Sequence, residues 1–90
     1  MIVTVTGANG FIGYHLVQDQ LARGRKVRAV DTTLSRLEGL RSHPSVELIR
    51  ADIRDTDGMR KAIDGSQVVF HLASAHLSIT LSEKEYWEIK

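Results

Sequence analysis

Cysteine is absent from this sequence of 90 residues. Disulfides, thiolate metal sites and catalysis by a cysteine are therefore excluded, and we expect a cytoplasmic protein. A strong charge of one sign is missing too, because 12 basic and 11 acidic side chains leave a formal charge of +1. A surface that binds nucleic acid needs a basic patch, so we expect no nucleic-acid partner.

Long hydrophobic runs are also missing. No apolar stretch approaches the roughly 18 residues that a membrane-spanning helix needs, so we expect no membrane partner. The first residues, MIVTVTG, lack the basic region of a signal peptide and are typical of a strand. No repeat, low-complexity segment or linker divides the chain, so residues 1–90 fit one small domain.

Short apolar runs alternate with segments of helical periodicity. We expect strands at residues 1–5, 26–30, 46–50 and 67–73. We expect helices at residues 11–23, around Leu34, Leu37 and Leu40, after a cap at Asp55 or Thr56, and from about Glu83, where Ser82 and Glu85 form a capping box. This alternation predicts an α/β fold, a Rossmann-like parallel sheet with helices on both faces and strand order 3-2-1-4.

The helix expected at residues 11–23 has a clear apolar pattern. Ile12, Leu16, Val17 and Leu21 recur at helical spacing, and Gly24 follows as a stop signal. This spacing is typical of a helix from Phe11 to Arg23.

The last part of the chain raises a separate question. The expected strand at 67–73 would lie at an edge of the sheet, yet it is nearly all apolar, whereas natural edges are usually charged, short or covered. The sequence also stops about two helical turns after Glu83. We expect either a truncated chain, whose missing C-terminal portion covers this edge, or a homo-oligomer in which another chain covers it.

The stretch TGANGFIG at residues 6–13 places glycines at 7, 10 and 13 between a strand and a helix. Gly7 can take the tight turn, Gly10 lets the backbone approach a pyrophosphate, and Gly13 lets the helix pack closely. The N-terminus of the helix then offers unpaired N–H groups to an anion. Glycine turns also precede helices without any ligand, but here Asp31 ends the second strand 18 residues after Gly13.

These residues resemble a known group of enzymes. TGANGFIG is similar to the TGxxGxxG motif of the short-chain dehydrogenase/reductase superfamily, and together with HLA at residues 71–73 it resembles the extended branch, the NAD-dependent epimerase/dehydratase family. The resemblance runs through the whole chain. It implies a dinucleotide cofactor, NAD or NADP, and hydride transfer on a nucleotide sugar or another small alcohol or ketone.

The resemblance also implies a set of cofactor-binding residues. The loop would cradle the pyrophosphate, Asp31 would accept from the adenosine ribose, Asp52 and Ile53 would border the adenine, and residues 72–74 would lie along the cofactor. The full set is Gly7, Asn9, Gly10, Phe11, Ile12, Gly13, Asp31, Asp52, Ile53, Leu72, Ala73 and Ser74. Asp31 and Asp52 have a plainer interpretation as turn residues, and Ser74 departs from the family's usual HLAA.

Asp31 favours NAD over NADP. Its carboxylate would face a like charge on a ribose 2′-phosphate, and two unit charges ~4 Å apart repel by about 4 kcal/mol at an effective dielectric constant of ~20. Arg28 and Arg36 are near in sequence and could reduce this penalty. Both are equally open to interpretation as solvated surface charges.

No catalytic or metal-binding residue is assigned. Tyr86 and Lys90 have the YxxxK spacing of the family's catalytic pair, but Tyr86 follows His71 by only 15 residues, and the pair should come tens of residues later. We expect this segment to pack its helix instead. His71 and His76 are five apart without further ligands, so no metal site is predicted.

Two functions of different classes remain open at this point. The first is the NAD-binding portion of an epimerase, dehydratase or related oxidoreductase, without the Tyr–Lys region or the substrate domain and thus with little or no turnover by itself. The second is a nucleotide-binding or regulatory module that stands alone, or an excised or designed Rossmann fragment, without enzymatic activity.

Overall fold

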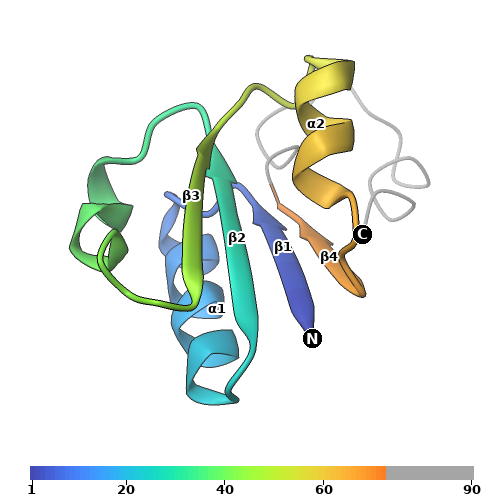
Figure 1. Cartoon of the computed structure of the whole chain (residues 1–90). Helices are drawn as coiled ribbons and strands as arrows, with labels where there is room; N and C mark the ends of the chain where they lie inside the picture. Colours follow the sequence, from blue (N-terminus) through green and yellow to red (C-terminus); the bar gives the residue numbers. More distant parts are fainter. Residues whose placement is uncertain (73–90) are drawn as a thin grey trace.

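The computed structural model describes residues 1–72, which form a four-stranded sheet flanked by helices (Figure 1). In chain order the elements are β1 (Ile2–Thr6), α1 (Phe11–Ala22), β2 (Lys26–Asp31), the 3-10 helix η1 (Ser35–Leu40), β3 (Val46–Arg50), α2 (Thr56–Ile63) and β4 (Val68–His71). The helix expected from about Glu83, with its capping box, lies outside the described residues.

All neighbouring strands are parallel, in the order β3-β2-β1-β4. Val3 of β1 pairs with Val27 of β2 on one side and with Val68 of β4 on the other, and Val27 pairs in turn with Val46 of β3. The predicted α/β class and the strand order 3-2-1-4 are confirmed.

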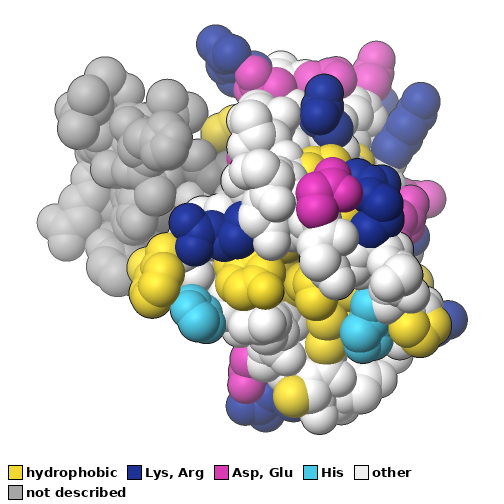
Figure 2. All heavy atoms as spheres, turned by 90° about the vertical axis from the view of Figure 1, so that its left-hand side faces the viewer, with side chains coloured by type: hydrophobic (Ala, Val, Ile, Leu, Met, Phe, Trp, Pro, Cys, Tyr) yellow, Lys and Arg dark blue, Asp and Glu magenta, His cyan; other side chains and the backbone are white. Residues whose placement is uncertain are grey.

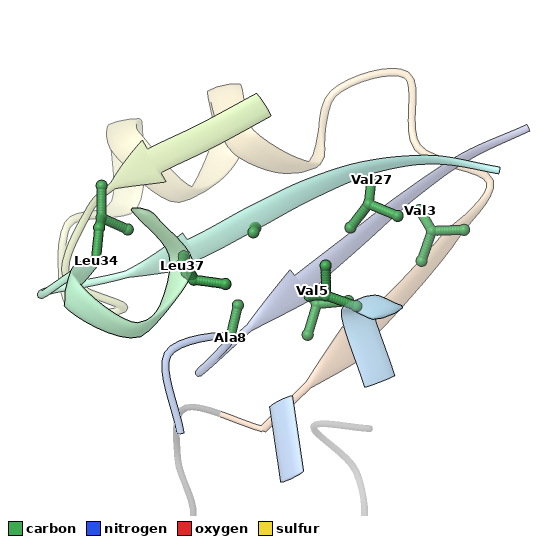
Figure 3. Packing of buried hydrophobic residues seen from close by; sticks show 8 residues of the cluster. Val3, Val5, Ala8, Val27, Leu34 and Leu37 are labelled. Carbon is green, nitrogen blue, oxygen red and sulfur yellow. The ribbon is translucent and has the colours of Figure 1, made fainter. Parts of the chain in front are cut away.

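One face of the sheet carries the main core. Because side chains alternate along a strand, Val3, Val5 and Val27 point to the same face. There they pack with Val17 of α1 and Leu37 of η1, and all five side chains are essentially inaccessible to solvent. Figure 3 shows the strand valines and Leu37 converging beneath β1 and β2. The short helix expected around Leu37 is confirmed as η1.

The other face is covered by α2. Thr4 of β1 and Arg28 of β2 alternate away from the valine core, and both donate hydrogen bonds to the carbonyl oxygen of Ala62 in α2, at 3.0 Å each. In Figure 1, α1 lies behind the sheet and α2 in front of it. Helices on both faces, as the sequence predicted, are therefore present.

Helix α1 packs Val17 into the core, with Leu16 and Leu21 half-buried against it. Its buried positions are Gly13, Val17 and Gln20, whereas Ile12 is 71% exposed. Ile12 therefore does not share the buried face of the apolar pattern. Gly13 faces the loop before the helix, and this close contact turns the neighbouring position 12 outward.

The side of the molecule that carries η1 and β3 is shown in Figure 2. Basic and acidic side chains are interspersed there, with apolar side chains in the lower half of the view. Arg41 and Glu38 form one such pair at 2.7 Å, and the arginine hydrogen bond lowers the pKa of Glu38. Both side chains are more than half exposed, so the pair contributes little to stability.

Candidate cofactor-binding site

The carboxyl ends of the strands bring most of the expected site residues to one edge of the sheet. Ala8 N donates to Val30 O at the end of β2, and Leu72 N donates to Thr6 O at the end of β1, both at 3.2 Å. Ala51 N donates to Asp31 O at 3.0 Å, which brings the segment after β3 to the same edge. Ligands of doubly wound folds bind outside this edge.

The glycine loop connects β1 to α1 by a tight turn. Gly7 has φ of 71°, a left-handed conformation that other residues rarely adopt. Gly10 N closes the turn on Gly7 O at 3.2 Å. A Cβ atom at Gly13 would lie 2.1 Å from Gly7 O, so only glycine lets the helix approach the loop this closely. The tight turn expected of Gly7 and the close packing expected of Gly13 are confirmed.

The first turn of α1 is open to an anion. Gly10 is the N-cap, so no side chain caps the helix, and no acidic residue lies in its first turn. Within residues 1–72, the backbone N–H groups of Phe11, Ile12 and Gly13 have no acceptor. The side chains of Phe11 and Ile12 are 67% and 71% exposed. Unpaired N–H groups at the positive end of a helix dipole suit a pyrophosphate group.

Asp31 ends β2 directly beside this loop. Its Oδ2 accepts a hydrogen bond from Asn9 N at 3.0 Å, and its Oδ1 accepts one from Thr32 N at 2.7 Å. Oδ1 also accepts from Thr32 Oγ1 at 3.3 Å, whereas Oδ2 has no second partner within residues 1–72, so Oδ2 can still accept from a ribose hydroxyl. The position and the remaining acceptor capacity fit a role in binding a ribose.

The two arginines near Asp31 in sequence have different positions. Arg28 is three residues before Asp31 on β2 and thus on the opposite face, where it donates to the carbonyl oxygens of Ala62 and Asp64. Its side chain is 22% exposed, so it is neither a solvated surface charge nor a group beside Asp31. Arg36, in contrast, donates from Nε to Asn9 O at 3.1 Å and therefore lies at the glycine loop.

Asp52 is held by a neighbouring arginine. The Arg54 side chain donates to both carboxylate oxygens, with Nη2–Oδ2 at 2.7 Å, and its backbone N–H donates to Oδ1 at 2.9 Å. These hydrogen bonds lower the pKa of Asp52 to about 2. Asp52 is thus a turn residue whose carboxylate stays ionised, and it precedes the half-buried Ile53. Its expected contact with adenine stays a prediction.

The end of β4 carries a polar contact that the sequence analysis did not predict. His71 pairs with Thr6 across β1 and β4, and His71 Nδ1 lies 2.7 Å from Thr6 Oγ1. Burial lowers the pKa of His71. The two residues are 65 apart in sequence, so only the register of the strands could have indicated the pair.

Some expected residues lie beyond the described part of the chain. Leu72 is half-buried and comes directly after β4. Its N–H donates to Thr6 O, so it lies at the same edge of the sheet as the glycine loop. Ala73 and Ser74, which would continue along the cofactor, lie outside the described residues, as do His76, Tyr86 and Lys90. Within residues 1–72 no group of three or more His, Cys, Asp or Glu side chains could hold a metal ion.

The family model for the 3-beta hydroxysteroid dehydrogenase/isomerase family matches residues 4–89. The chain belongs to this family. The resemblance to extended short-chain dehydrogenases/reductases that the glycine motif carried is thereby confirmed. None of the helices in residues 1–72 is long and apolar enough to cross a membrane.

This hydroxysteroid dehydrogenase family member is similar to curated dehydrogenases and to solved structures that contain NAD. A 3 beta-hydroxysteroid dehydrogenase/Delta 5→4-isomerase of Mycobacterium tuberculosis is 42% identical over 72 residues, which are 80% of this chain and 19% of that protein. The structure of Thermus thermophilus UDP-glucose 4-epimerase in complex with NAD is 35% identical, with a TM-score of 0.64 over 81% of this chain and 24% of that one. The dTDP-glucose 4,6-dehydratase of Bacillus anthracis, also in complex with NAD, shares the fold, with a TM-score of 0.74 at 23% identity over 87% of this chain and 28% of that one. The chain thus spans about a fifth to just over a quarter of these proteins' lengths.

Proposed function

We propose that residues 1–90 are the NAD-binding portion of an extended short-chain dehydrogenase/reductase. The observation that carries this proposal is the meeting of two groups at one edge of the sheet. Three unpaired N–H groups open α1, and the carboxylate of Asp31 lies at the adjacent strand end, bonded to the same loop. The first suits a pyrophosphate and the second suits ribose hydroxyls, which are the two polar parts of an adenine dinucleotide.

The remaining contacts follow the order of the strands. Gly7, Gly10 and Gly13 shape the loop that would receive the pyrophosphate, with backbone contacts from Asn9, Phe11 and Ile12. Asp52 and Ile53 would border the adenine, and Leu72, Ala73 and Ser74 would lie along the cofactor. Bound NAD would supply the hydride chemistry, and the residues of this chain would bind and orient it.

NAD is the cofactor that the site favours. The carboxylate of Asp31 would repel a 2′-phosphate, and Arg28, which points into the other face of the sheet, cannot offset that charge. Arg36 lies at the glycine loop instead, where its Nε donates to Asn9 O. Relatives whose structures hold NAD support the same choice.

The reaction we propose for the whole protein is hydride transfer between NAD and an alcohol or ketone, on a steroid, a nucleotide sugar or another small molecule. We expect little or no turnover from residues 1–90 alone, since the expected catalytic Tyr–Lys pair and the substrate domain are not among them. The outer edge of β4 would be covered by a further portion of the protein or by a second copy of the chain.

Calorimetric titration of the 90-residue chain with NADH and then with NADPH tests the proposal. We expect NADH to bind at submillimolar to millimolar concentration and NADPH to bind more weakly. The absence of binding by either would overturn the proposal and would favour a fold without a cofactor role. Preference for NADPH would leave a cofactor site but overturn the role given to Asp31.

A further inference from the structure

Asn9 connects the glycine loop to the end of β2 and the segment after it by five hydrogen bonds. Its backbone N–H donates to Asp31 Oδ2, and its backbone carbonyl accepts from Arg36 Nε. Its side-chain Oδ1 accepts from Arg36 N at 2.6 Å, and its Nδ2 donates to Thr33 Oγ1 at 3.1 Å and Ser35 Oγ at 3.4 Å. All these partners lie 22 to 27 residues later in the chain.

Through these hydrogen bonds Asn9 joins two parts of the candidate site. Asn9 lies between Gly7 and the start of α1, so it belongs to the part of the site that suits a pyrophosphate. Asp31 and the residues that follow it belong to the part that suits a ribose. In residues 1–72, the side chain of Asn9 makes three of the bonds that join these two parts.

We propose that Asn9 is a positioning residue whose side chain sets the spacing between the loop and Asp31, so that a ligand carrying both a diphosphate and a ribose meets both parts at once. The inference rests on the proposed function. A ligand that spans two sites gains affinity when the sites are already at the right distance, and it loses that gain when they move independently. A ligand that occupies only one site has no such gain to lose.

This difference separates positioning from a general effect on folding. We expect Asn9→Ala to weaken the binding of ADP, which spans both parts, roughly tenfold, the equivalent of one to two net hydrogen bonds. We expect the binding of adenosine and of inorganic pyrophosphate, which each fill one part, to change less than about twofold by the same reasoning. Titrations followed by NMR shifts of the 90-residue chain can measure all three, including weak ones.

A second variant removes the partners of the Asn9 side chain instead of Asn9 itself. The double substitution Thr33→Val with Ser35→Ala removes the acceptors of Asn9 Nδ2 without altering the loop. It should show the same pattern, and combining it with Asn9→Ala should add little further loss, because both remove the same contacts. Gln18→Ala is the matched control: it removes an exposed amide that donates to Tyr14 on α1, away from both parts.

The outcomes are distinct. Selective weakening of ADP by Asn9→Ala and by the double substitution, but not by Gln18→Ala, supports the inference. Equal weakening of ADP, adenosine and pyrophosphate overturns it, since that result indicates a general loss of structure. Failure of the unsubstituted chain to bind ADP and NADH overturns the proposed function and with it this inference.

Discussion

Gly13 of α1 faces the carbonyl oxygen of Gly7 so closely that a Cβ atom at position 13 would lie 2.1 Å from that oxygen and 2.8 Å from the Cα of Ala8. Both obstructing atoms are backbone, so no side chain can rotate to make room. The approach of the helix to the loop also brings the N–H groups of its first turn to the edge where Asp31 lies. The same contact therefore matters for stability and for the candidate site.

The first prediction concerns this contact. Gly13→Ala should destabilise the chain by about 1–3 kcal/mol or more, because the helix must shift away from the loop. Gly39→Ala is the control, since a Cβ atom there meets nothing within 4 Å. Urea unfolding followed by circular dichroism measures both. Equal stability of the two variants would show that the loop and helix are less tightly packed than described.

The second prediction concerns the choice of cofactor. Asp31→Asn removes the charge that would repel a 2′-phosphate and keeps an acceptor near the loop. We expect the ratio of NADPH to NADH affinity to rise at least tenfold, a change of about 1.4 kcal/mol. Asp57→Asn, an exposed carboxylate on α2, should leave the ratio unchanged. An unchanged ratio in Asp31→Asn would mean that Asp31 does not contact the ribose.

The third prediction concerns the start of α2. Asp55 is its N-cap, and Asp55 Oδ1 accepts from Gly58 N at 3.0 Å. Asp55→Ala should lower the free energy of unfolding by about 1 kcal/mol. Asp57→Ala removes a carboxylate two residues later whose ion pair with Arg60 is highly exposed, and it should change stability by less than about 0.5 kcal/mol. The sequence left Asp55 and Thr56 open as caps, and the structure decides for Asp55.

The fourth prediction concerns pH. Burial favours the neutral imidazole of His71, so its pKa is lower in the folded chain than its ordinary value of 6.5. As the pH falls through 6.5, the unfolded chain binds a proton that the folded chain does not, and stability falls until the pH reaches the folded pKa. His71→Asn, which keeps a polar atom near Thr6, should reduce this fall. Urea midpoints measured between about pH 8 and about pH 5, roughly the range in which histidine titrates, provide the comparison.

An unchanged pH profile in His71→Asn would contradict the prediction, because burial of His71 would then not cause the fall in stability.

The elements themselves followed closely from the sequence. The β-branched runs became β1, β2 and β3, the glycines marked the turn into α1, and the leucines at 34, 37 and 40 marked η1. These features depend on local periodicity and on the backbone freedom of glycine, which neighbouring residues express directly. The cofactor roles of Asp31 and Asp52 stay predictions, although both residues lie at the expected edge of the sheet.

The directions in which individual side chains point were harder to predict from the sequence. Ile12 fits a helical apolar pattern and yet is exposed, because the contact between Gly13 and Gly7 sets the rotation of α1. Arg28 is close to Asp31 in sequence and yet lies on the other face, because three residues along a strand reverse the direction. Neither outcome depends on residue type alone.

The sequence by itself determined the glycine turn and the strands and helices, because apolar runs, helical periodicity and glycine spacing act over a few residues. The succession of strands and helices along the chain then indicated the parallel α/β fold and its strand order. Only the tertiary structure decided how Asn9 reaches Thr33 and Arg36, and how Thr6 meets His71. Those contacts join residues that are 24 to 65 apart, and they exist only once strand register and helix rotation have fixed which side chains face each other.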